Sequence, residues 1–313
     1  MTVFQNQFVL NTDQTEELKA SVFAVYTSAV FLFQPKGLLT VFLTELNRNK
    51  LMTDDERICQ YEMKLHTEGT SLKEGLIMFD TIMKELESLG NSQTKKTYAA
   101  HGGKEPLFGV KVGDLNSLIK KYKLKNSHDL ALKLYSSGNY DAMYLAGLIA
   151  DSAAMTKDTV MLWLSEAYCE MIAEYAVGSA ASETAFAMEL VRELIQSDKE
   201  LYASCGYSML AFYVMRVPDA ELDKNELSSL LRKIESSIHT SPNRVRFQMN
   251  AAAAAVGTSV PDLFDEVFAA GERIGSVMID TGGARIKVPS ITEKLMKAKK
   301  YNRVGNKRKA GRC

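Results

Sequence analysis

The pattern of apolar and polar positions changes near residue 70. Before that point, β-branched and aromatic residues cluster without a helical period, and the pattern predicts no particular fold. From residue 71 onward, apolar side chains return at spacings of three and four residues, which is the period of one helix face. The first such stripe is formed by Leu76, Phe79, Ile82, Met83 and Leu86. We therefore predict an N-terminal extension of unclear structure at 1–70 and a helical domain at 71–293.

The extension at 1–70 has two open interpretations. It is either a poorly ordered segment or an artefact of gene prediction, with translation starting at Met52 or Met63. Its apolar run at 21–33 follows acidic rather than basic residues, and the run is shorter than the roughly 20 residues that a membrane span needs. We expect neither export nor membrane insertion.

Beyond residue 126, short polar turns alternate with helices of about 15 residues. Three helices have small residues at their centres, namely Ala146-Gly147, Cys205-Gly206 and Ala251 to Ala255. Small side chains let neighbouring helices approach closely, and their recurrence is typical of stacked helix pairs. The sequence therefore predicts an all-α fold, an α-solenoid of HEAT-like helical repeats. For the alanine run, the approaching partner is either another helix or a nucleic-acid backbone, and we favour the helix.

The composition favours a soluble globular protein. The chain has 313 residues with 38 basic and 38 acidic side chains, and 46% of its residues are hydrophobic. The four cysteines, Cys59, Cys169, Cys205 and Cys313, form no CxxC pair, and the four histidines are scattered, so no metal-ligand motif is formed. We predict reduced thiols in a cytoplasmic protein, with no metal and no organic cofactor.

Positive charge is concentrated at the C-terminal end. Residues 1–90 hold thirteen acidic and eight basic side chains, whereas the last twenty residues hold nine Lys or Arg and no acidic residue. Such an asymmetry is typical of a segment that binds an anionic polymer. We predict a basic tail at 294–313 that contacts nucleic-acid phosphates, with a solvated, disordered terminus as the alternative. The tail residues expected to contact phosphates are Lys299, Lys300, Arg303, Lys307, Arg308, Lys309 and Arg312.

Several stretches of the helical domain resemble one protein family. They are FGVKVGDLNSLIKKY, NYDAMYLAGLIAD, YCEMIAEYAVGSAA, ELYASCGYSMLAFYV and NRVRFQMNAAAAAVGTSVPDL. Together with the basic ending, they are similar to a branch of the DNA alkylation repair family over residues 71–313. The resemblance implies a solenoid of HEAT-like repeats, double-stranded DNA as the partner, and a DNA glycosylase activity that removes N3- and N7-alkylated purines.

The chain departs from this family at the positions that carry the chemistry. The resemblance implies a cleft with two Trp, an Asp and an Arg. Aromatic faces attract the cationic alkylated base, and the carboxylate stabilises the developing sugar cation or orients water. The corresponding positions lie within 169–178, 203–210 and 251–256, and none of the four residues is present there. The lone tryptophan, Trp163, is expected in the core.

A helix predicted at 166–178 carries the acidic candidates for catalysis. Glu170 and Glu174 are four residues apart and share one face of that helix, with Tyr175 beside them. Together they could replace the missing Asp and one aromatic plate, as catalytic and base-contacting residues. The alternative is that both glutamates are solvated or bond neighbouring helices. Because a buried, unpaired carboxylate is costly unless it is used, the burial of these side chains is informative.

Four further residues on the next two helices would face the same side. Tyr207 and Asn250 are candidates for base or DNA contact, with core packing and an inter-helix hydrogen bond as the respective alternatives. Arg244 and Arg246 are candidates for a phosphate clamp at a helix N-terminus, where backbone N–H groups add attraction. The alternative for the two arginines is an exposed helix start.

Three functions stay open from the sequence. The first is a DNA glycosylase of the alkylation repair type that acts on alkylated duplex DNA. The second is a catalytically inactive relative that binds damaged, bent or branched DNA by shape, which the missing Trp, Asp and Arg favour. The third is a protein–protein scaffold. We expect a monomer without a membrane partner, located in the cytoplasm and associated with the bacterial nucleoid if it binds DNA.

Overall fold

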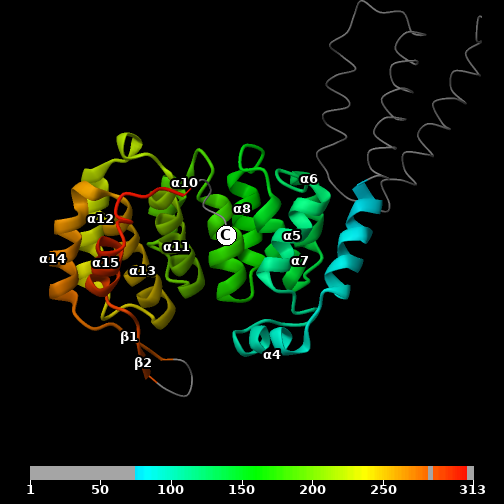
Figure 1. The fold of residues 1–313 in the computed structure, drawn as a ribbon, viewed down its shortest axis with the longest axis horizontal. Coiled ribbons are helices and arrows are strands. Elements are labelled where there is room, and N and C mark those ends of the chain that lie inside the picture. The colour runs from blue at the N-terminus through cyan, green and yellow to red at the C-terminus, as the bar shows by residue number, and fades with distance from the viewer. Residues whose placement is uncertain (1–74, 281–284, 309–313) are drawn as a thin grey trace, which may run out of the picture. The chain divides into compact units, whose positions relative to one another are not determined.

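The computed structural model describes residues 75–280 and 285–308, and the extension predicted at 1–70 lies outside these residues. Within the described part the chain is mainly helical, which confirms the predicted all-α class (Figure 1). None of the described helices is both long and apolar enough to cross a membrane.

The described helices form two rows of neighbouring elements (Figure 1). The first row consists of α6 (His128–Ser136), α8 (Lys157–Glu166), α10 (Ala187–Leu194), α12 (Lys224–Ser237) and α14 (Phe264–Ile274). The second row consists of α7 (Tyr140–Ile149), η1 (Met171–Val177) continued by α9 (Gly178–Ala181), α11 (Glu200–Arg216), α13 (Asn243–Ser259) and α15 (Ile291–Lys300). Each first-row helix is followed by its second-row partner, so the rows are successive helix pairs, as the repeat pattern predicts.

Helices at the N-terminal side of the described residues precede these rows. They are a helix at 75–88, α4 (Ser92–Ala100) and α5 (Val112–Tyr122). Of the predicted stripe on the first of them, Ile82 and Leu86 are fully buried, but Leu76 is 53% exposed. Leu76 lies in the first turn of this helix, whereas the contact with α5 lies further along, where Lys121 and Tyr122 donate to Glu85.

Polar turn residues begin several of the helices by capping them. The side chains of Asn139, Thr156, Asp223 and Ser290 accept backbone N–H groups in the first turns of α7, α8, α12 and α15. Such caps satisfy donors that have no partner inside a helix. At Ser290 the bond is reciprocated by Glu293, which forms a capping box. The polar turns of the sequence thus set where the repeats begin.

Small residues at the helix centres allow neighbouring helices to pack closely, both within the second row and between the rows. A Cβ atom added to Gly147 of α7 would lie 2.5 Å from the backbone Cα of Ala176 in η1. A Cβ atom at Gly206 of α11 would lie 2.9 Å from the Leu194 Cβ. The alanines at 252–255 in α13 are buried as well. Helix packing, rather than approach of a nucleic-acid backbone, therefore explains the small centres of the repeats.

A buried carboxylate holds the loop in front of α5. Asp141, in the first turn of α7, is 1% exposed and accepts the backbone N–H groups of Phe108, Gly109 and Val110 at 2.7, 3.0 and 2.7 Å. Three such bonds satisfy the charge of the carboxylate without a cationic partner. The two sequence stretches FGVKVGDL and NYDAMYLAG therefore belong to one structural unit.

Three elements differ from the sequence-based expectation. The helix predicted at 166–178 is divided, because α8 ends at Glu166 and Ala167 takes an extended conformation. A two-stranded antiparallel hairpin, β1 (Met278–Asp280) and β2 (Arg285–Lys287), was not predicted, and it pairs Ile279 with Ile286. The basic tail predicted from residue 294 begins inside α15, which packs against α13 and α14.

We expect Gly147→Ala to lower the free energy of unfolding by about 1–3 kcal/mol, because the new methyl group must displace the backbone of η1. Alanine is otherwise a better helix former than glycine, so this substitution would normally stabilise a helix. A loss of stability would therefore indicate that the two helices approach closely at Gly147. Gly113→Ala in α5 is the control, since a Cβ atom there meets nothing within 4 Å. Urea denaturation should show a loss for the first variant and no loss for the control; equal behaviour would contradict the packing argument.

Candidate functional site

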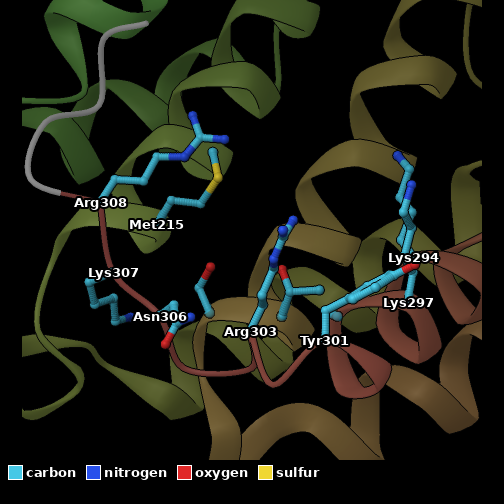
Figure 2. A pocket seen from close by; sticks show the side chains of 11 residues that line it. Met215, Lys294, Lys297, Tyr301, Arg303, Asn306, Lys307 and Arg308 are labelled. Atoms are coloured by element: carbon cyan, nitrogen blue, oxygen red, sulfur yellow. The ribbon is translucent and has the colours of Figure 1, made fainter.

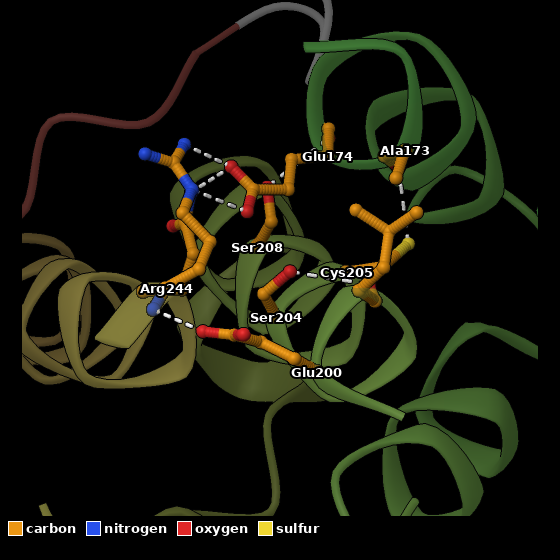
Figure 3. A network of polar contacts seen from close by, with 9 residues as sticks. Ala173, Glu174, Glu200, Ser204, Cys205, Ser208 and Arg244 are labelled. Carbon is orange, nitrogen blue, oxygen red and sulfur yellow. Dashed lines mark hydrogen bonds and ion pairs between the residues drawn. The ribbon is translucent and has the colours of Figure 1, made fainter. Parts of the chain in front are cut away.

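The strongest polar cluster of the described residues surrounds Glu174. Its side chain is 0% exposed, and it lies in η1, facing α13 across α11 (Figure 3). The Arg244 guanidinium contacts both carboxylate oxygens, with Nε 2.7 Å from Oε1 and Nη2 bonded to Oε2. The side-chain amide of Gln248 donates to Oε2 as well. Both oxygens of this carboxylate are therefore occupied by donors from α13.

Neighbouring groups fix the positions of the two charged partners. The Ser208 hydroxyl of α11 donates to the Glu174 carbonyl oxygen at 3.1 Å, and the Cys205 thiol donates to the Ala173 carbonyl oxygen at 3.1 Å. Arg244 lies in the first turn of α13, where its backbone N–H donates to the Glu200 carboxylate at 2.6 Å. The cluster thus links η1, α11 and α13 through side chains and backbone together (Figure 3).

Glu174 and Arg244 depend on each other for their charged states. Burial raises the pKa of the Glu174 carboxyl, and the charge of Arg244 and the hydrogen bond from Gln248 oppose that rise. Burial acts to lower the pKa of the Arg244 guanidinium, but the Glu174 carboxylate outweighs it and the pKa is raised. Each partner therefore offsets the desolvation of the other.

Aromatic side chains next to the ion pair are also engaged. The Arg244 guanidinium lies over the Phe247 ring, 4.5 Å from its centroid. Tyr175 is half-buried and packs edge-on against Phe212, with ring centroids 6.1 Å apart. Burial raises the pKa of the Tyr175 hydroxyl. The cluster contains an acid, a cation and aromatic faces, but these groups bind one another.

The two acidic candidates do not act together. Glu174 is fully buried, whereas Glu170 is half-buried and lies beside the loop that contains Gly102. Glu170 is the residue before the π-helix η1, whereas Glu174 lies inside it. Glu174 alone of the two accepts hydrogen bonds from α13 among the described contacts, although the charge of Glu170 also acts on Arg244.

The other candidates of this face are held by the fold. Tyr207 is 1% exposed, and its hydroxyl has no hydrogen-bond partner among the described residues. The Asn250 amide donates to the Pro289 carbonyl oxygen at 3.0 Å, which ties α13 to the turn before α15. Arg246 donates to the carbonyl oxygens of Met278 and Ser241. Core packing and inter-segment hydrogen bonds therefore describe these three residues, and Arg244 is not an exposed helix start.

The lone tryptophan and the described cysteines lie inside the protein. Trp163 is 2% exposed and stacks on Tyr135 with ring centroids 4.2 Å apart, which confirms its expected place in the core. Cys169 and Cys205 are free, buried thiols, and burial raises the pKa of each. These groups contribute packing rather than a reactive surface.

The C-terminal segment, residues 301–308, crosses the C-terminal ends of α13 and α11. The backbone N–H of Gly305 donates to the Thr258 carbonyl oxygen at 2.8 Å, and that of Arg308 to the Met215 carbonyl oxygen at 2.7 Å. The Lys307 ammonium donates to the Val214 carbonyl oxygen at 2.9 Å and pairs with Asp219 at 2.7 Å. These bonds satisfy helix-terminal carbonyls that have no intrahelical partner. Up to residue 308 the predicted tail is thus part of the fold.

A pocket of about 410 Å³ lies between this segment and α15 (Figure 2). Met215 and Thr258 contribute from the ends of α11 and α13. No acidic residue lines it, and we call it the basic pocket after its five cationic residues, which are Lys294, Lys297, Arg303, Lys307 and Arg308. The two helix residues, Lys294 and Lys297, were not among the predicted phosphate contacts, although their spacing of three on a helix puts them on one face.

The remaining tail candidates lie outside this pocket. Lys299 and Lys300 are exposed on α15, with their ammonium groups 5.4 Å from the Phe264 ring centroid and 5.7 Å from that of Tyr301. Lys309 and Arg312 lie outside the described residues. Among the described residues, no cluster of His, Cys, Asp and Glu could hold a metal ion.

Sequence comparison relates the chain to known proteins. A family model described as "DNA alkylation repair enzyme" matches residues 82–269. The uncharacterized protein Lmo0209 of Listeria monocytogenes is 30% identical over 229 residues, which is 72% of this chain and 98% of the relative. The uncharacterized protein Lin0241 of Listeria innocua is 29% identical over 233 residues, 73% of this chain and 100% of the relative.

A solved structure is similar to the chain in fold and sequence. It is described as representing "a new family of proteins related to the HEAT-like repeat DNA glycosylases with affinity for branched DNA structures". The two chains superpose with a TM-score of 0.71 at 34% identity, covering 75% of this chain and 99% of the other. The stacked helix pairs described above are therefore HEAT-like repeats.

We expect Glu174→Gln to lower the free energy of unfolding by about 3 kcal/mol, because Arg244 would keep a largely buried charge without a counter-charge. The matched control is Glu235→Gln, which breaks an equally bidentate contact with Arg273, at 2.5 and 2.9 Å, between the exposed faces of α12 and α14. Water solvates the groups left by the control, so its loss should be much smaller. Urea denaturation measures both, and equal losses would contradict the burial argument.

Proposed function

Since the chain belongs to the DNA alkylation repair enzyme family, we propose that it binds branched or otherwise distorted double-stranded DNA without hydrolysing the N-glycosidic bond. The observation that carries this proposal is the pairing of Glu174 with Arg244. The basic surface at the C-terminal end and the described affinity of the structural relative support it.

Hydrolysis of a glycosidic bond needs a carboxylate that faces the reacting sugar. Such a group stabilises the developing sugar cation, and it does so because its own charge is not already compensated. Glu174 has no exposed surface, and both of its oxygens accept hydrogen bonds from Arg244 and Gln248. Because the charge of this carboxylate is already compensated by Arg244, its electrostatic attraction for a substrate cation is weak.

The aromatic partner of an alkylated base is engaged in the same manner. A cationic base is attracted to an open aromatic face. Here the Phe247 ring already carries the Arg244 guanidinium, and Trp163 stacks inside the core. The acid and the cation that a substrate complex would bring together are both supplied by the chain itself, which favours binding by shape over base chemistry.

Charge at the C-terminal end supplies the attraction for DNA. Residues 285–308 contain nine Lys or Arg and a single acidic residue, Glu293. Contacts between such side chains and phosphates release counterions and give affinity without reading sequence. The structural relative is described as having affinity for branched DNA structures, and the coverage of nearly its whole length by this chain supports the same substrate class here.

We expect the wild-type protein to release no alkylated purine from methylated duplex DNA, as followed by chromatography of the free bases. Under the same conditions the protein should still bind the duplex, so that lack of release is not lack of binding. Release that is lost in Glu174→Gln, at a temperature where this variant stays folded, would instead establish a glycosylase that uses Glu174.

We expect about tenfold tighter binding to a four-way DNA junction than to a linear duplex of the same length and composition, measured by fluorescence anisotropy with hydroxyl-ended strands. The double variant Arg303→Gln/Arg308→Gln should reduce the slope of log affinity against log salt concentration by about two, because two phosphate contacts are lost. Equal affinity for junction and duplex would contradict the proposed substrate class.

The control for this variant removes the same charge elsewhere. Lys120→Gln/Lys125→Gln changes two exposed lysines at the end of α5 and in the turn after it, and the salt dependence of binding should be unchanged. A control that lowers the slope as much as Arg303→Gln/Arg308→Gln would show that charge alone, rather than the C-terminal surface, sets the affinity.

A further inference from the structure

Most of the cationic side chains of the basic pocket form no ion pair within the described residues. Lys307 is engaged by Asp219 and by the Val214 carbonyl oxygen. None of the other four cations forms an ion pair within the described residues, and no acidic residue lines the pocket. In Figure 2, Lys307 points away from the opening around which Lys294, Arg303 and Arg308 are placed.

Neutralisation of helix ends does not account for this surplus. The C-terminal end of a helix carries partial negative charge and attracts cations. However, the carbonyl oxygens of Val214, Met215 and Thr258 are already reached by the Lys307 ammonium and by backbone N–H groups of the C-terminal segment. The side chains of Lys294, Lys297, Arg303 and Arg308 are not needed for these bonds.

Lys294 adds an independent indication of an anionic ligand. It projects from the middle of α15 into the pocket and is partly buried. Burial lowers the pKa of its ammonium group, and no acidic residue lines the pocket that it enters. Partial burial of an uncompensated charge is unfavourable, and an anion in the pocket would supply the missing partner.

We propose that the basic pocket binds a terminal phosphate group of DNA, so that the protein distinguishes phosphorylated strand ends from hydroxyl ends. This inference rests on the proposed function in one respect, namely that the phosphate belongs to DNA. It adds a specific recognition element to what would otherwise be general attraction between phosphates and a basic surface.

The charge of the pocket fits a phosphomonoester better than a phosphodiester. A terminal phosphate carries about −1.5 to −2 charges at neutral pH and three acceptor oxygens, whereas each backbone phosphodiester carries one charge. Four unpaired cations can surround the first from several directions. Arginine and lysine at the same site combine planar bidentate donors with point charges.

The shape of the pocket also favours the end of a DNA strand over its interior. α15 forms one side, the C-terminal segment forms the other, and the ends of α11 and α13 lie between them. An internal phosphodiester must continue through a sugar on both of its sides, so it needs two paths out of the pocket. A terminal phosphate continues on one side alone, and a volume of about 410 Å³ accommodates it with part of its nucleotide.

The full-length protein should be tested by anisotropy with labelled duplexes that differ only at the unlabelled ends, which are 5′-phosphate, 3′-phosphate or hydroxyl. We expect at least one phosphorylated end to bind about tenfold tighter than the hydroxyl end. Equal affinity for all three would overturn the inference. The proposed function is tested separately by binding of the hydroxyl-ended four-way junction. A protein that binds the junction but does not prefer phosphorylated ends would therefore contradict only the proposal for the pocket.

Variants of the pocket residues test whether the pocket is responsible for the preference for phosphorylated ends. The quantity to compare is the ratio of the affinity for the phosphorylated duplex to that for the hydroxyl-ended duplex. Lys294→Met should bring the ratio of phosphorylated to hydroxyl-ended affinity close to one, and Arg303→Gln, at an exposed position, should do the same if Lys294→Met folds poorly. Lys125→Met, an exposed lysine outside the pocket, should keep the tenfold ratio. A ratio that stays near ten in both pocket variants would overturn the assignment.

The pocket would also suit a phosphate group that is not part of DNA, such as a free phosphate ion or a free nucleotide. Inorganic phosphate and a nucleoside monophosphate should be added as competitors, with sulfate at equal ionic strength as the reference. We expect a short phosphorylated oligonucleotide to compete at much lower concentration than either. Equal competition by the nucleoside monophosphate would mean that the ligand is a free nucleotide, which would overturn recognition of a DNA end.

Discussion

The close approach of neighbouring helices, both within the second row and between the two rows, governs the packing of the repeat domain. Gly147 lies against the backbone of Ala176, and Gly206 against Leu194 and Ile195. At these contact points the distance between the helices leaves room only for small side chains. Polar groups on one helix must therefore reach their partners past small neighbours. This is how Arg244 on α13 reaches Glu174 on η1, beside the short side chain of Ser208 on α11 (Figure 3).

The pairing of Glu174 with Arg244 has consequences for both stability and function. It joins segments seventy residues apart in the chain, and the charge of Arg244 compensates that of the buried carboxylate. In the first row, similar bidentate pairs such as that of Arg192 with Glu226 join α10 to α12 at the surface, where water competes with them. The same pair of residue types thus acts as a buried link in one row and as a solvated contact in the other.

Cations of the C-terminal end serve two different purposes. Lys307 and the backbone of the C-terminal segment complete the ends of α11 and α13, so that this segment becomes part of the repeat domain. Lys294, Lys297, Arg303 and Arg308 surround a pocket without such partners (Figure 2). A protein without net charge can present a strongly basic site because its charges are unevenly distributed, with thirteen acidic and eight basic side chains in residues 1–90 but nine basic and no acidic ones in residues 294–313.

The helix pairs could be predicted from the sequence alone, because the apolar period, the polar caps such as Asn139 and the small helix centres such as Gly147 are local signals. It also identified Glu174, and the spacing of Arg244 and Gln248 by four residues was a signal that they share a face. The tertiary structure was needed to show that these side chains meet, that Glu174 is fully buried while Glu170 is half-buried, and that residues 301–308 line a pocket. Such contacts join segments that are distant in the sequence. Their geometry depends on how closely the helices pack, and a local sequence pattern does not predict that distance.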